Sequence, residues 1–195
     1  KSAAGNAPVI YVSDGIPLLA STGLHSAEST HEMGDPHVWM DPNLVLIWVD
    51  NIEKALIAED PANRSLYQAN AEAYRKQLIE LDAWVRQQVD QVPQANRRLV
   101  TDHQSLGYFA ARYGFEQVGA IIPSFTSQAQ PSAQELAALE DTIKALGVRA
   151  VFVSVAVNPA LAQRLAEDTH IKVVRIYTGS LSEADGPAST YLDLI

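Results

Sequence analysis

The sequence predicts an α/β protein in which a doubly wound lobe with a parallel sheet is joined by a long connector helix to a remnant of a second α/β lobe. Two patterns lead to this prediction. In residues 94–195, short β-branched runs alternate with helical patterns across short joints, as in parallel sheets covered by helices. Ahead of them, residues 61–93 have the apolar spacing of one long helix, and residues 1–60 offer one strand, one loop and one helix.

The composition limits the class of function. The chain has 195 residues, of which 47% are hydrophobic and 19% are charged, as in ordinary globular proteins. Its formal net charge of -9 makes nucleic acid and anionic membrane surfaces poor partners. The absence of cysteine excludes thiolate metal sites, iron–sulfur clusters, a cysteine nucleophile and disulfides. The chain also lacks the run of about 18 apolar residues that would cross a bilayer.

The first part of the chain is expected to contain a strand, a loop and a buried helix. The run PVIYVS, residues 8–13, follows a proline and is rich in β-branched residues, which favours a strand. The polar stretch 21–34 has no periodicity and is expected to be a loop. Asp41 and Pro42 then have the residue types of a helix N-cap and first helical position.

The connector helix is predicted from a second Asp-Pro pair and a regular apolar stripe. Asp60 and Pro61 repeat the start signal, and Pro93 ends the helix. The stripe has spacings of three, four and seven residues, and consists of Tyr67, Tyr74, Leu78, Leu81, Val85, Val89 and Val92. Trp48, in the preceding helix, and Trp84 are expected to be packing residues.

The remaining lobe shows clear start and stop signals. Ser132 with Glu135 three residues later forms a capping box, and Gly147 stands where that helix should stop. His170 stands at another expected helix end, where a histidine suits the helix dipole. Strands are predicted at 97–102, 118–122, 149–155 and 172–177, with helices at 105–114, 132–147 and 159–169.

Two histidines stand at positions that favour metal binding. His37 lies in GDPHVWMDP, residues 34–42, between two Asp-Pro pairs that restrict the backbone. His103 follows the first strand of the lobe, and open parallel sheets bind ligands beyond the carboxyl ends of their strands. Asp102 and His103 are the only ionisable residues at those strand ends. Imidazole suits zinc, copper, iron and nickel, so the pair suggests a metal held between two bodies.

These motifs resemble those of the metal-binding receptors of bacterial ABC importers, the zinc/manganese solute-binding protein family. The likeness rests on DPHVWMDP and TDHQSLGYFAARYG, and continues through PSAQELAALEDTIKALGVRAVFV, VNPALAQRLAED and GSLSEADGPASTYLDLI. It implies two α/β lobes joined by a long helix, with the metal in the cleft and His37 and His103 as ligands. It also implies that the protein is not an enzyme. The expected metal is zinc, with manganese as the alternative. The expected location is periplasmic or cell-surface, often as a lipoprotein, with a membrane permease as partner.

The chain departs from the family pattern at several ligand positions. The family's first-lobe histidine would lie before residue 1, Gly179 stands where an Asp is usual, and Ser154 stands where a Glu is common. We therefore expect a fragment that lacks most of the N-terminal lobe, has an incomplete site and self-associates through exposed apolar surface. The other donors remain open: residues outside this chain, water, a second chain, Asp102, Glu183 or Asp185.

Other interpretations of these residues stay open. Asp102 fits an orienting hydrogen-bond acceptor or a helix cap better than a ligand. His25 and His31 fit solvated loop residues, or an accessory loop that collects metal. Trp39 is expected to pack beside His37 and limit water. A metal-dependent hydrolase using His37 and His103 is the alternative function, although no His-Glu-x-x-His or Gly-x-Ser-x-Gly motif is present. A receiver-type module is also disfavoured, because its acidic cluster is missing.

Overall fold

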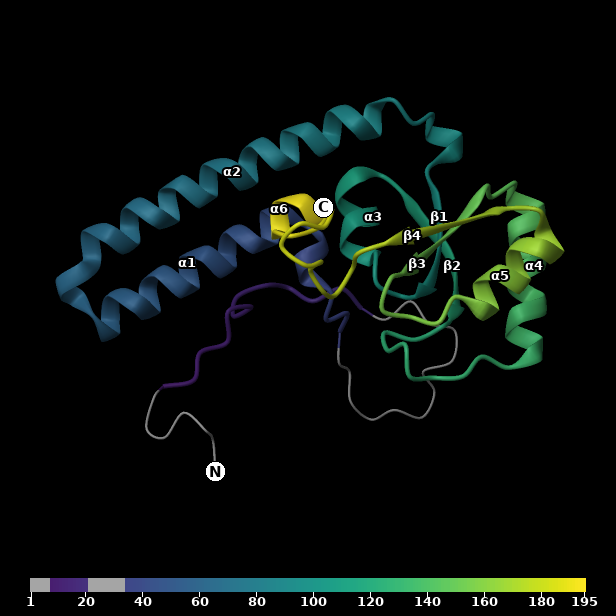
Figure 1. The fold of residues 1–195 in the computed structure, drawn as a ribbon, viewed down its shortest axis with the longest axis horizontal. Coiled ribbons are helices and arrows are strands. Elements are labelled where there is room, and N and C mark those ends of the chain that lie inside the picture. The colour runs from purple at the N-terminus through teal and green to yellow at the C-terminus, as the bar shows by residue number, and fades with distance from the viewer. Residues whose placement is uncertain (1–7, 21–33) are drawn as a thin grey trace.

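A computed structural model describes residues 8–20 and 34–195 of the chain. Its centre is a four-stranded parallel sheet in the order β2-β1-β3-β4 (Figure 1). The strands are β1 (Arg98–His103), β2 (Glu116–Ile122), β3 (Ala150–Ser154) and β4 (Lys172–Ile176). The strand order reverses next to β1, so the end of β1 lies at the position where open sheets bind ligands.

Helices cover both faces of the sheet, as the doubly wound prediction requires. On one face, α4 (Ala133–Leu146) and α5 (Ala160–Thr169) pack on the strands through a buried core that includes Val100, Ile143, Val151 and Leu165. On the other face, α3 (Gly107–Tyr113) packs through Leu106 and Ala110 onto Leu99. The crossover through α3 therefore lies on one face of the sheet and the crossovers through α4 and α5 lie on the other, which confirms the predicted fold class of this lobe.

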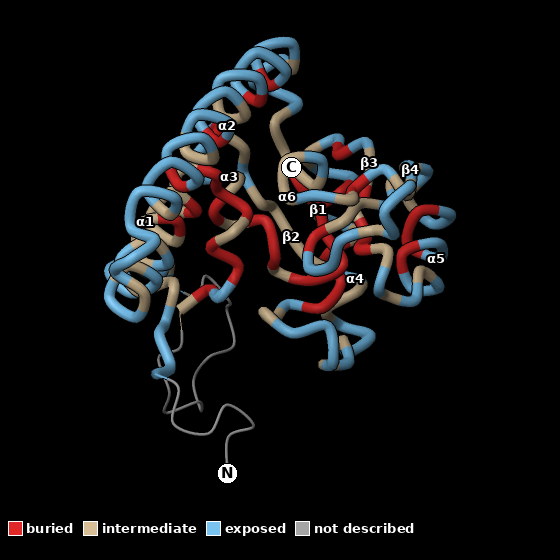
Figure 2. The backbone as a smooth tube through the Cα atoms, turned by 60° about the vertical axis from the view of Figure 1, so that its left-hand side comes forward, coloured by how far each residue is buried: buried red, intermediate tan, exposed pale blue. Residues whose placement is uncertain are grey.

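A long helical hairpin lies beside the sheet. It consists of α1 (Pro42–Glu59), a 3-10 turn (Pro61–Asn63) and α2 (Arg64–Asp90), and the two helices lie side by side in Figure 1. Val45 and Val49 of α1 pack against Ala71 and Leu78 of α2, so the predicted apolar stripe is confirmed as a packing face. Figure 2 shows this burial on the inner sides of the helices, with the outer sides exposed.

The local start and stop signals are present as predicted. The Asp41 side chain accepts a hydrogen bond from the backbone N–H of Asn43, and Ser132 forms its capping box with Glu135. Gly147 ends α4 with φ 62, and His170 ends α5 in the left-handed region with φ 57. In these places residues within four positions of each other decide the helix end.

The C-terminal segment joins the hairpin to the sheet lobe. A short helix that the sequence did not predict, α6 (Tyr191–Leu194), packs against the core of the hairpin. The Tyr191 hydroxyl donates a 2.7 Å hydrogen bond to the carbonyl oxygen of Trp39. Asp82 of α2 accepts hydrogen bonds from Asn43 and from Tyr113 of α3. The Tyr113 bond holds the hairpin against α3 of the sheet lobe, whereas the Asn43 bond joins α1 to α2 within the hairpin.

Two expectations about the N-terminal part and α2 were wrong. Residues 8–11 are irregular and residues 12–15 form a turn, so PVIYVS is not a strand. No described strand lies beside this run, and a strand needs a hydrogen-bonded neighbour to form. Trp84 is 52% exposed on the outer side of α2 and is not a packing residue, whereas Trp48 is half-buried. Within the described residues, none of the helices has the length and apolarity needed to cross a membrane.

Candidate metal centre

His37 is held by a tight turn that leads into the 3-10 helix Val38–Met40. Oδ1 of Asp35 accepts a 2.9 Å hydrogen bond from the backbone N–H of His37, and lies 2.7 Å from Nδ1 of its ring. Asp35 and His37 are buried, with exposed fractions of 2% and 6%. A buried carboxylate needs a polar partner, and the imidazole is that partner.

His103 is the last residue of β1 and is held in a similar way. Oδ2 of Asp102 lies 3.1 Å from Nδ1 of the His103 ring, and both residues are buried. The carbonyl oxygen of His103 accepts a 2.6 Å hydrogen bond from the Thr101 hydroxyl, and Gln117 donates to that hydroxyl at 3.0 Å. These contacts restrict the backbone as well as the ring.

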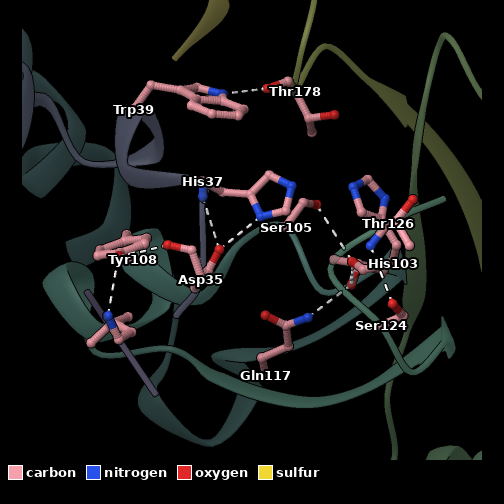
Figure 3. Close-up of polar contacts among 12 residues, drawn as sticks. Asp35, His37, Trp39, His103, Ser105, Tyr108, Gln117, Ser124, Thr126 and Thr178 are labelled. Carbon is pink, nitrogen blue, oxygen red and sulfur yellow. Dashed lines mark hydrogen bonds and ion pairs between the residues drawn. The ribbon is translucent and has the colours of Figure 1, made fainter. Parts of the chain in front are cut away.

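The structure brings the two imidazoles together, although they are far apart in the sequence. Their ring centroids are 5.3 Å apart with an interplanar angle of 63°, and Figure 3 shows the rings side by side. Each Nδ1 faces a carboxylate, so Nε2 is the nitrogen that remains for another ligand on both rings. Two Nε2 atoms bound to one tetrahedral metal at roughly 2.0–2.1 Å would place the centroids about 5 Å apart. The observed spacing therefore fits a shared metal ion.

Aromatic rings border the histidine pair. The Trp39 ring centroid lies 5.3 Å from that of His37, as expected from the sequence, and the Phe125 centroid lies 6.3 Å away. Nε1 of Trp39 donates a 2.6 Å hydrogen bond to the carbonyl oxygen of Thr178, which follows β4 (Figure 3). Apolar rings beside a charged or metal-binding group reduce its contact with water and strengthen its electrostatic interactions.

The buried carboxylate of Asp102 is only half satisfied. Its Oδ1 atom is buried and has no hydrogen-bond partner in the part of the chain that the structure describes. Leaving a buried acceptor unpaired costs roughly 1–3 kcal/mol, and more when it is charged. A positive charge near His103 would offset part of this cost, which is a second reason why the site suits a cation.

The other predicted donors do not join the two histidines. Glu183 and Asp185 are exposed in a turn after β4, and Ser154 is buried at the end of β3, where its hydroxyl accepts from Ala156. A Cβ atom placed on Gly179 would have no atom within 4 Å. Across residues 8–20 and 34–195, no group of three or more His, Cys, Asp or Glu side chains is placed to hold a metal. His25 and His31 lie outside the described residues.

Sequence reasoning missed three residues that hold the His37 loop. The sequence marks Asp35 only as part of an Asp-Pro pair, although its position two residues before His37 is a usual one for a side chain that binds a following backbone N–H. Gly107 lies against the Asp35 carboxylate, and Tyr108 donates a 2.9 Å hydrogen bond to the carbonyl oxygen of Asp35. Burial raises the pKa of Tyr108, so its hydroxyl keeps the proton that it donates. No local pattern links α3 to Asp35.

Comparisons with known proteins agree on one family of metal-binding proteins. The sequence profile of zinc-uptake complex component A, periplasmic, matches residues 1–195. The manganese-binding lipoprotein MntA of Halalkalibacterium halodurans is 32% identical over 93% of this chain and 57% of its own length. The iron-binding protein YfeA of Yersinia pestis is 32% identical over 96% of this chain and 59% of its own length. The chain thus spans less than two thirds of these relatives.

Solved structures agree with these matches. A manganese-bound periplasmic metal-binding protein from Candidatus Liberibacter asiaticus superposes with a TM-score of 0.80 at 28% identity, over 96% of this chain and 66% of that one. The periplasmic zinc-binding protein TroA from Treponema pallidum has a TM-score of 0.81 at 25% identity, over 97% of this chain and 68% of that one. The overall fold is therefore shared with these proteins.

Proposed function

Because the chain belongs to the family of periplasmic zinc-uptake complex component A, we propose that it is the metal-binding part of a receptor that delivers a metal ion to an ABC-type importer. The metal is the cargo of the protein. The family consists of metal-binding components of uptake systems and not of enzymes, which disfavours a hydrolase built on His37 and His103.

The observation that carries this proposal is the spacing of the two imidazoles. His37 and His103 come from different parts of the chain, yet their ring centroids lie 5.3 Å apart with each Nδ1 facing a buried carboxylate. In this proposal both Nε2 atoms bind the same ion. Asp102 orients the ring of His103, as carboxylates next to metal-bound histidines do.

Zinc is the metal that the described donors favour, with manganese as the alternative. Relatives are named for manganese, iron and zinc, which supports a divalent transition metal as cargo. Both proposed donors are imidazole nitrogens, which suit zinc, whereas manganese prefers carboxylate and water oxygen. A zinc ion takes four donors in most protein sites. In this proposal the further donors are water or groups outside the described residues.

The arrangement of the proposed receptor follows its family. Residues 94–195 form the C-terminal lobe, residues 61–93 contain the connector helix, and residues 1–60 belong to the N-terminal lobe. The segment with His25 and His31 assists metal capture without supplying the tightest site. The names of relatives as periplasmic proteins or lipoproteins support a location in the periplasm or on the cell surface, and a membrane permease as partner.

Self-association is a further part of the proposal. Val9 is 71% exposed and Tyr11 is 70% exposed, in a run whose residue types favour strands. Apolar, unpaired segments of this kind tend to pair with another chain. Sedimentation of the purified protein would show a dimer or larger species, and replacing Val9 and Tyr11 with Ser would shift it toward the monomer.

The proposed function is tested by metal analysis of protein purified without chelator. Mass spectrometry of the eluted metal should give zinc, and a competition titration should give tighter binding of zinc than of manganese. Manganese or iron as the retained and preferred ion would change the cargo. The absence of tight binding to any of the three would contradict a metal receptor.

A further inference from the structure

We propose that Asp35 is a positioning residue, which holds His37 in the tautomer and orientation that metal binding needs, and that the start of α3 holds Asp35 in turn. The inference rests on the proposed function, because it concerns how one of the two proposed ligands is held. It assigns roles to Asp35, Gly107 and Tyr108, which do not contact the ion themselves.

The contact between Asp35 and His37 selects one nitrogen of the ring. Oδ1 of Asp35 lies 2.7 Å from Nδ1 of His37, and the two side chains are only 3% and 8% exposed. A carboxylate can only accept hydrogen bonds, so Nδ1 must carry a proton in this contact. In a neutral ring Nε2 then has the free lone pair, and it is the nitrogen available to the metal.

If Asp35 only stabilised the turn, its contact with the His37 ring would not be needed. The same Oδ1 accepts a 2.9 Å hydrogen bond from the backbone N–H of His37, which is the local bond of a common turn. Asn forms that turn equally well. The ring contact is additional, because an ionised acceptor binds the imidazole N–H more strongly than a neutral amide does. Asn and Asp at position 35 therefore separate the turn from the positioning role.

The start of α3 fixes where the Asp35 carboxylate lies. A Cβ atom at Gly107 would be 2.6 Å from Oδ2 of Asp35, so a larger residue would displace the carboxylate. The Tyr108 hydroxyl donates to the carbonyl oxygen of Asp35 at 2.9 Å and accepts from the backbone N–H of Leu19 at 3.0 Å. The glycine therefore makes room for the carboxylate. The Tyr108 hydroxyl holds the backbone of Asp35, as Figure 3 shows.

This arrangement couples the two proposed ligands. His103 ends β1, and Gly107 with Tyr108 begins α3 directly after it. One stretch of chain, residues 103–108, therefore supplies one histidine and holds the carboxylate that orients the other. The spacing between the two rings is thus set within the same connection, before any ion binds. Ligands that are ordered in advance lose less conformational freedom when the metal binds.

The test combines zinc affinity with the ring tautomer of the metal-free protein. The variants are Asp35→Asn, Asp35→Ala and Gly107→Ala. Asp141→Asn, on the exposed side of α4, makes the same change of charge away from the site. Zinc affinity is measured by competition titration with the metal alone. Nitrogen-15 NMR of the imidazoles, at a pH where they are neutral, reports the fraction of His37 protonated at Nδ1.

Asp35→Asn should weaken zinc binding about 10-fold, the scale of losses caused by removing a partner of a ligand, and Asp35→Ala by more. Both variants should lower the fraction of His37 protonated at Nδ1, Gly107→Ala should act in the same direction, and Asp141→Asn should match the parent. The proposal is overturned if Asp35→Asn binds zinc as the parent does and the His37 tautomer is unchanged in Asp35→Ala.

If the proposed function were wrong, the same measurements would give a different set of results. His37→Ala, measured in parallel, would then bind zinc as the parent does, while the NMR result would still decide whether Asp35 sets the tautomer. If Asp35→Ala does not fold, Asp35→Asn decides the question, since it keeps the backbone hydrogen bond of the turn.

Discussion

Nε1 of Trp39 donates a 2.6 Å hydrogen bond to the carbonyl oxygen of Thr178, across a sequence separation of 139 residues. This bond joins the short helix after His37 to the segment after β4. Tyr191 strengthens the connection, since its hydroxyl donates to the carbonyl oxygen of Trp39. The His37 loop is therefore fixed to the C-terminal part of the sheet lobe as well as to α3.

Replacing Trp39 with Phe should destabilise the protein through this bond. Phe keeps an aromatic ring beside His37 but leaves the carbonyl of Thr178, a buried residue, without its donor. The expected loss in the free energy of unfolding is about 1–2 kcal/mol, measured by urea denaturation. Trp84→Phe is the matched control, because Trp84 is 52% exposed and should change stability by less than about 0.5 kcal/mol. Equal losses in both variants would argue against the hydrogen bond as the cause.

His37→Ala and His103→Ala should each weaken zinc binding by about 10-fold or more, because each variant removes one proposed donor. Isothermal titration with zinc measures the effect. The control is His170→Asn, which removes an exposed imidazole at the end of α5. Asn tolerates the left-handed backbone of this position. Parent-like affinity in both alanine variants would place the metal site elsewhere in the molecule.

Deleting residues 24–32 should leave the tightest metal-binding event nearly unchanged. We expect His25 and His31 to assist capture only, so the deletion should remove weaker binding events or slow the association with zinc. A titration that resolves tight from weak sites, together with stopped-flow association rates, measures both. If the tightest event disappears, one of these two histidines is a primary ligand.

Asp82 should make stability depend on pH in the acid range. Burial raises the pKa of Asp82, but hydrogen bonds from Arg86, Asn43 and Tyr113 outweigh burial and leave the pKa below its ordinary value of 3.8. As the pH falls, the unfolded chain therefore takes up the proton first. The stabilisation is complete above the ordinary pKa and is lost as the pH falls through the folded-state pKa.

Asp82→Asn should remove this acid dependence and lower stability near neutral pH by about 1–2 kcal/mol, since hydrogen bonds to a charged acceptor are lost. Urea denaturation at a series of acid pH values measures both effects. Asp90→Asn is the control, because the Asp90 side chain is 80% exposed and lies 3.7 Å from Arg97. An unchanged acid dependence in Asp82→Asn would show that other carboxylates cause it.

Gly179→Asp should tighten metal binding by about 10-fold or more, because it adds a carboxylate where receptors of this type usually have one. No atom lies within 4 Å of a Cβ atom placed on Gly179, so the new side chain has room. Manganese should gain more than zinc, since carboxylate oxygen suits it better. Gly179→Asn, with the same shape and no charge, is the control in parallel titrations. Equal affinities in both variants would mean that the new carboxylate does not reach the ion.

The sequence by itself determined the elements whose signals are local. The N-cap at Asp41, the capping box of Ser132 and Glu135, and the stop at Gly147 each depend on residues within one helical turn. Alternation of strands and helices was enough to predict a doubly wound lobe. Candidate ligands also followed from the chain, because the strand end at His103 is a place where such folds bind ligands.

Only the tertiary structure decided which distant groups meet. The contact of Asp35 with Gly107 and the bond from Trp39 to Thr178 depend on how the chain returns to the same place, and no local pattern encodes that path. The run at 8–13 has the residue types of a strand, yet it forms no strand because a strand exists only beside a hydrogen-bonded neighbour. Helical periodicity places Trp84 outside the apolar stripe of α2, but only the structure shows how far that side is covered, with Trp84 52% exposed.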